Sequence, residues 1–171
     1  PDAFAIFCAV SSASNSIGDH PISTPNLRAP FSANEKLLIK RHIDKIETII
    51  DKLVNYSGCL FEIIYDNKLP MPGMSFVEKD FRGTNRYKVV INYDIVKNES
   101  LSVIAHILSH EWGHHVMGHI DIFSPEKQLL ETRVTRQNKE NEADLFAAQF
   151  IKKYSYDTDN IIAFFREHPH D

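Results

Sequence analysis

The chain has 171 residues, of which 43% are hydrophobic and 25% are charged, and its formal net charge is −4 at pH 7. This length and composition predict one globular domain, 1–171, with a sizeable core. The acidic balance gives no electrostatic basis for a nucleic-acid partner, and every apolar run is shorter than the roughly 18 residues that a membrane span requires.

The N-terminal part of the chain predicts an irregular arm, 1–31. Ser, Asn and Pro are frequent in 11–31, as is typical of loops. The apolar stretch 4–10 has no basic residues before it, so the sequence supports no signal peptide. We expect a soluble protein whose compartment, cytoplasmic or secreted, stays undetermined.

A long amphipathic helix is expected after the arm. Ser32-Ala-Asn-Glu35 is a capping-box pattern, which is typical of a helix start. Apolar residues then recur at helical spacing from Leu38 to Val54. The helix should end at about Tyr56, because Gly58 is a helix stop signal.

Three short strands are predicted next. Residues 59–65 and 87–93 are rich in β-branched and aromatic side chains, and 74–78 carries a weaker strand pattern. Turn-forming residues at 70–73 and 82–85 separate them. The three strands predict a small sheet.

Residues 98–118 predict a buried helix that becomes rich in histidine. Asn98 or Ser100 can cap its start, and Gly118 is typical of its end. Gly113 lies inside it, where glycine costs about 1 kcal/mol relative to alanine and often marks close packing or the approach of a substrate. One stripe repeats with the helical period along this segment: Val103, Ile107, His110, His114 and Met117.

Residues 110–114 read His-Glu-Trp-Gly-His, an H-E-x-x-H motif. Histidines four residues apart lie one turn apart on the same helix face, so His110 and His114 can bind a single zinc ion. Glu111 lies beside the metal and off the ligand face, where it can act as a general base toward a water molecule. The motif therefore indicates a zinc-dependent hydrolase.

A second motif, Glu-Asn-Glu-Ala-Asp, begins a helix predicted over 140–154. Glu140 is expected to complete a His-His-Glu zinc site with an open fourth position. Asp144, one turn further on, is expected to accept a hydrogen bond from the far nitrogen of a ligand histidine. Glu142 is the rival ligand, but at roughly 100° per residue it points about 200° away from Glu140, so both cannot bind the metal.

The two motifs, H-E-x-x-H and E-x-x-A-D, resemble those of the gluzincin metallopeptidases. The closest pattern is that of the HtpX-like proteases and CAAX prenyl endopeptidases, and ImmA-like peptidases carry similar motifs. The resemblance covers roughly residues 85–154, lacks the membrane helices of the first group, and implies Glu140 as third ligand and Asp144 as orienting acid. It further implies zinc as the cofactor and a protein or peptide as the substrate.

The order of the elements predicts an α+β fold, a minimal zincin-like domain. A small twisted sheet should pack on the H-E-x-x-H helix, a second helix should carry Glu140, and a short helix near 158–167 should end the fold. The expected substrate site is a strand edge that pairs with the peptide by β-addition, although the sequence does not indicate which strand.

The remaining polar side chains have two expected roles. An oxyanion donor is required for hydrolysis, and the C-terminal candidates are Tyr154, Arg166, His168 and His170. The other histidines are expected to be structural or exposed, namely His106, His115 and His119.

Other zinc sites and other functions are alternatives to this interpretation. A metzincin would need its third histidine at Ile120, so that class is excluded. Ser57-Gly-Cys-Leu60 superficially resembles the deformylase ligand segment, but a small buried hydrophobe is the favoured role of Cys59. A non-peptide amide hydrolase and a catalytically silent zinc-binding scaffold stay open, although a purely structural site has no need of Glu111.

Overall fold

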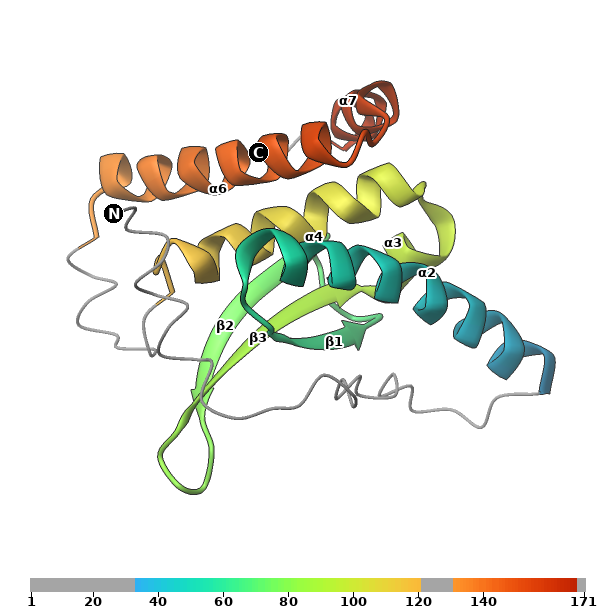
Figure 1. Ribbon diagram of the computed structural model, residues 1–171, viewed down its shortest axis with the longest axis horizontal. Helices are drawn as coiled ribbons and strands as arrows, with labels where there is room; N and C mark the ends of the chain where they lie inside the picture. The colour runs from blue at the N-terminus through green and yellow to red at the C-terminus, as the bar shows by residue number, and fades with distance from the viewer. Residues whose placement is uncertain (1–32, 121–130, 169–171) are drawn as a thin grey trace.

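The computed structural model describes residues 33–120 and 131–168 (Figure 1). The predicted arm 1–31, Ser32 of the capping box and His170 lie outside the described residues. The helices and strands are α2 (Ala33–Ser57), β1 (Glu62–Asp66), β2 (Gly73–Lys79), β3 (Asn85–Asn92), α3 (Tyr93–Asn98), α4 (Leu101–Val116), α6 (Arg133–Lys153) and α7 (Thr158–Glu167).

The three predicted strands form one mixed sheet in the order β1-β3-β2. β1 pairs with β3 in parallel, with Ile63 opposite Val89, and β2 pairs with β3 as an antiparallel hairpin. Residues 80–84 close the hairpin, where Asp80 Oδ1 accepts backbone hydrogen bonds from Arg82 and Thr84, each at 2.9 Å. The strand order makes β3 the central strand, and its residues 89–91 are buried.

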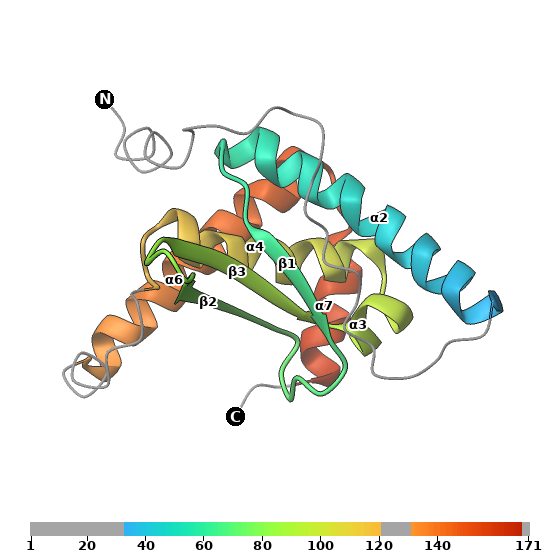
Figure 2. The ribbon, with the colours of Figure 1, turned by 90° about the horizontal axis from the view of Figure 1, so that it is seen from below.

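Helix α4 lies between the sheet and α6. It contacts β2 and β3 on one side and α6 and α7 on the other, and α2 packs beside it (Figure 1). Seen from below, the strands cross in front of α4 (Figure 2). Twelve of its 16 residues are buried, which is why its apolar residues extend well beyond the single predicted stripe. The predicted α+β fold, with a small sheet on the motif helix and a second motif-bearing helix, is confirmed.

Local signals set both ends of α4. Ser100 is its N-cap, and the Ser100 side chain accepts a hydrogen bond from the backbone nitrogen of Val103 at 3.3 Å. Asn98, the other predicted cap, instead ends the short helix α3, which the sequence did not predict. The helix stops before Gly118, whose φ of 71° belongs to the left-handed region that glycine tolerates.

Two contacts fix α4 in the core. Trp112 is fully buried, and its indole nitrogen donates to Ser57 Oγ at 3.0 Å, at the end of α2. On the opposite side, Gly113 allows close approach of α6, because a Cβ there would lie 3.2 Å from Phe146 Cβ and 3.3 Å from Ala143 Cα. The glycine inside the motif helix thus marks close packing, as predicted, and that packing brings the second motif to the first.

Candidate metal centre

Three candidate ligand atoms converge between α4 and α6. His110 Nε2 and His114 Nε2 lie 3.1 Å apart, because the two histidines are separated by one helical turn. Glu140 reaches them from α6, with its carboxylate oxygens 3.3 Å from His110 Nε2 and 3.7 Å from His114 Nε2. Within the described residues this is a group that could hold a metal ion, with all ligand atoms within 4.8 Å of one another.

Asp144 forms a hydrogen bond with the first of these histidines. Its Oδ1 lies 2.9 Å from His110 Nδ1, so that nitrogen donates to the carboxylate and leaves the Nε2 lone pair facing His114 and Glu140. Burial opposes a charge on His110, but the hydrogen bond with Asp144 and the nearby carboxylates outweigh it and raise its pKa. The same hydrogen bond lowers the pKa of Asp144 and keeps it ionised.

His114 is in a different electrostatic environment. Burial, followed by the effect of His110, lowers the pKa of His114 to about 3. Its imidazole is therefore neutral at physiological pH and has a lone pair to offer a cation. Two imidazoles and one carboxylate are a donor set that zinc accepts.

Glu111 lies beside this cluster but faces the sheet. Ser75 Oγ on β2 donates to Glu111 Oε2 at 2.6 Å. Gly73 lies against the same side chain, since a Cβ there would come within 3.0 Å of Glu111 Cγ and 2.8 Å of Ile107 Cγ2. Burial raises the pKa of Glu111, which makes its carboxylate a stronger base than an exposed one.

Among the other histidines of the segment, His115 and His119 are buried and His106 is half-buried. His115 Nε2 donates to the Lys88 carbonyl at 2.8 Å and ties α4 to β3. The ring of His106 packs against Phe165, and burial lowers its pKa to about 4. His119 lies just beyond the helix, where it contacts both His114 and Glu142 of α6.

Comparison with known proteins decides the family. The family model Peptidase U49 matches residues 5–165, which include both motifs. The chain belongs to the Peptidase U49 family. No curated protein and no solved structure matched the chain.

Membership of Peptidase U49 supports peptidase activity and a protein or peptide substrate. The predicted resemblance is thereby confirmed at the level of a peptidase, whereas the match does not extend to the gluzincin subgroup. None of the described helices has both the length and the apolar character needed to cross a membrane.

Two candidate oxyanion donors of this Peptidase U49 protein make contacts away from the ligand cluster. The Tyr154 hydroxyl donates to the Lys52 carbonyl at 3.1 Å, which joins α6 to α2. His168 stacks on Phe164 at the end of α7, and Arg166 is exposed on that helix. The chemistry of these residue types is readable from the sequence, but the direction of their side chains is not.

Cys59 lies outside the candidate metal centre. It is buried in the core beside Ser57, with 3% of its surface exposed. Cys59 is disulfide-bonded and precedes β1, which begins at Glu62, so it is neither the small hydrophobe at a strand start that was favoured nor a metal ligand.

Proposed function

We propose that this Peptidase U49 protein is a zinc-dependent endopeptidase whose catalytic unit is the single domain 1–171. His110, His114 and Glu140 are the proposed ligands, Glu111 the general base, and Asp144 the residue that orients His110. The observation that supports this most directly is the convergence of three ligand atoms within 4.8 Å beside Glu111.

Zinc fits the residues present better than other common cations do. Magnesium and calcium prefer oxygen ligands, whereas imidazole suits zinc, and catalytic zinc sites use three protein ligands of this kind. When bound, zinc would supply Lewis-acid chemistry, lowering the pKa of water toward about 7 and polarising the scissile carbonyl.

Glu111 performs the proton transfers in this proposal. Its carboxylate accepts a proton from the attacking water and later donates it to the nitrogen of the leaving amine. Ser75 donates to this carboxylate twice, from its hydroxyl to Oε2 and from its backbone, which fixes the orientation of the base. The raised pKa supports this role, because a base poised closer to neutral pH both accepts and returns a proton more readily.

β2 is the proposed substrate-binding strand. It lies at the edge of the sheet, and within the described residues its only strand partner is β3. Gly73 and Ser75 of this strand contact Glu111, so a peptide paired along the free edge of β2 would run past the general base.

The Ser75 contact gives a testable expectation. In Ser75→Ala, Glu111 loses a hydrogen bond that fixes its orientation, and kcat/KM for peptide cleavage should fall about 10-fold or more, since hydrogen bonds to charged groups contribute about 1.5–3 kcal/mol. Ser75→Thr keeps the hydroxyl and should retain most of the activity. Wild-type cleavage by Ser75→Ala would show that the contact does not position Glu111.

The proposal as a whole is tested by locating the metal and removing it. An anomalous-scattering map at the zinc edge should show one peak between His110, His114 and Glu140. Chelation should abolish cleavage of an unfolded protein substrate, and stoichiometric zinc should restore it. A peak elsewhere, or cleavage that persists after complete chelation, would refute the zinc-peptidase mechanism.

A further inference from the structure

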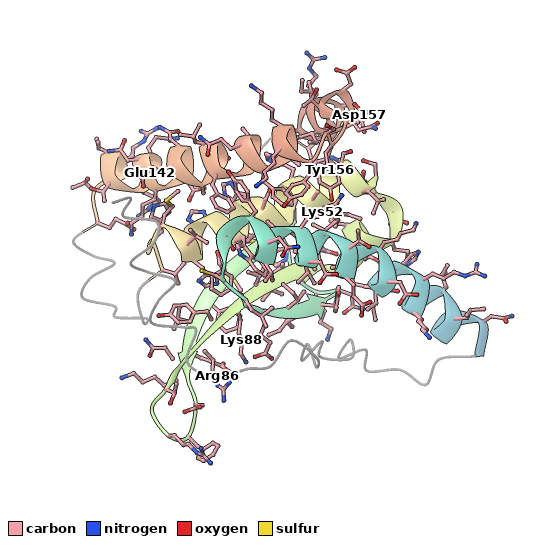
Figure 3. The ribbon with its side chains drawn as sticks, viewed as in Figure 1. Lys52, Arg86, Lys88, Glu142, Tyr156 and Asp157 are labelled. Atoms are coloured by element: carbon pink, nitrogen blue, oxygen red, sulfur yellow. The ribbon has the colours of Figure 1, made fainter. Side chains whose placement is uncertain are left out.

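The ring of His119 lies between a proposed zinc ligand and a carboxylate. His119 Nδ1 is 3.1 Å from His114 Nδ1, and His119 Nε2 is 2.8 Å from Glu142 Oε2. Only 5% of the His119 side chain is exposed, whereas 61% of the Glu142 side chain is. Figure 3 shows Glu142 on the N-terminal part of α6, close to the C-terminal end of α4.

The positions of the protons follow from these contacts. His114 directs Nε2 toward His110 and Glu140, so in a neutral ring the proton is on Nδ1. His119 Nδ1 lies 3.1 Å from His114 Nδ1 and faces this proton, so it must be unprotonated in order to accept the hydrogen bond. His119 then carries its own proton on Nε2 and donates it to Glu142.

The backbone fixes His119 in this place. The His119 nitrogen donates to the His114 carbonyl at 2.9 Å, and Gly118 donates to His115 at 3.1 Å. These two hydrogen bonds, with Gly118 in the left-handed conformation, are a Schellman motif, which folds the chain back over the last helical turn. Lys139 Nζ on α6 donates to the His119 carbonyl at 3.1 Å and holds the turn against that helix.

We propose that His119 and Glu142 are positioning residues for the metal centre, holding His114 through the chain His114–His119–Glu142. This inference rests on the proposed function, because it assumes that His114 binds zinc. The chain gives His114 the same support that Asp144 gives His110 directly: a fixed tautomer and a fixed ring orientation, with a carboxylate at its end. It also assigns a role to Glu142, which cannot share the metal with Glu140.

Zinc affinity, measured by competition with a chromophoric chelator, tests the inference independently of catalysis. Outer partners of metal ligands typically contribute 10- to 100-fold in affinity, so His119→Ala and Glu142→Ala should each weaken zinc binding by about that factor. His119→Gln should restore part of the affinity, because its amide offers one acceptor to His114 and donors to Glu142. The melting temperature of metal-free Glu142→Ala should match that of the wild type, because Glu142 is mostly exposed.

A double-mutant cycle separates the chain from a general effect of charge. If Glu142 acts through His119, the double variant His119→Ala/Glu142→Ala should bind zinc as weakly as His119→Ala alone. A through-space effect of the Glu142 carboxylate would persist without His119. The fold-losses of zinc affinity in the two single variants would then multiply in the double variant. As a matched control, Asp144→Ala combined with Glu142→Ala should show multiplying losses, since these acids support different histidines.

The failures of the two proposals are distinguishable. A wild-type protein that binds no zinc, or binds it without His110 and Glu140, overturns the proposed function and the positioning chain with it. A wild-type protein that binds zinc through those residues, with unchanged affinity in His119→Ala and Glu142→Ala, overturns only the chain. Multiplying losses in the double variant overturn it as well.

Discussion

Glu111→Gln is expected to keep zinc and the fold while lowering the rate of peptide cleavage by roughly 10²- to 10⁴-fold, the usual contribution of general base catalysis. The amide has nearly the same shape as the carboxylate, and its oxygen can still accept from Ser75 Oγ. It cannot accept a proton from water at neutral pH. The measurement is kcat/KM on a protein substrate, together with the zinc content of the purified variant.

The same substitution should not destabilise the metal-free protein. The pKa of Glu111 is raised in the folded state, so folding disfavours its ionised form, and the stability lost in this way grows as the pH rises from the unfolded pKa to the folded pKa. At neutral pH the uncharged amide of the variant avoids this loss. The melting temperature of Glu111→Gln in the presence of a chelator should therefore equal or exceed that of the wild type.

An exposed glutamate provides the control for Glu111→Gln. Glu167→Gln on α7 removes the same charge on a different helix and should leave cleavage unchanged. Full turnover by Glu111→Gln would remove Glu111 from the mechanism. The zinc site would then have no established catalytic role, as in the alternative of a catalytically silent zinc-binding scaffold.

The elements that were predicted correctly are those specified by local patterns. Helix α4 has a cap at Ser100, a stop at Gly118 and a repeating apolar pattern, and all three are readable within about 20 residues. The first seven residues of α6 were not predicted as helix, because Arg133–Lys139 is polar and exposed and shows no apolar period. Helix α3 has only six residues, too few for a period to appear.

The metal centre likewise has a part that local patterns specify and a part that depends on tertiary packing. The proximity of His110 and His114 follows from helix geometry, and the approach of Glu140 depends on tertiary packing that the second motif made predictable. Ser75 was not predicted, because a serine in a strand carries no signal of which helix it will contact. That contact exists only because the sheet packs on α4.

His119 is an intermediate case. A structural or exposed position was predicted for it, as it was for His106 and His115. A glycine that ends a helix in a Schellman motif returns the following residue to a carbonyl one turn back, which here is that of His114. The dipeptide Gly118-His119 therefore contained a usable signal. This dipeptide does not indicate that Glu142, on the next helix, contacts His119.

Removal of a proposed ligand should weaken zinc binding at least as much as loss of a positioning residue does. His110→Ala and Glu140→Ala each delete one of three protein ligands. Dividing the roughly 10–16 kcal/mol of a four-ligand zinc site evenly gives about 3 kcal/mol per ligand, or about a 10²-fold loss of affinity. Both variants should therefore lose zinc during dialysis against a chelator that the wild type withstands.

Glu142→Ala is the matched control, because it deletes a carboxylate on the same helix two residues from Glu140. The Glu142 side chain contacts His119 rather than the ligand cluster. The variant should therefore bind one zinc ion when the metal is in excess. Its zinc affinity should be lower than that of the wild type, because the positioning chain is interrupted. Elemental analysis of the three variants after gel filtration in buffered zinc makes the comparison. Zinc lost from Glu142→Ala but kept by Glu140→Ala would mean that the other face of α6 binds the metal. Because the two glutamates point about 200° apart, at roughly 100° per residue, the two outcomes exclude each other.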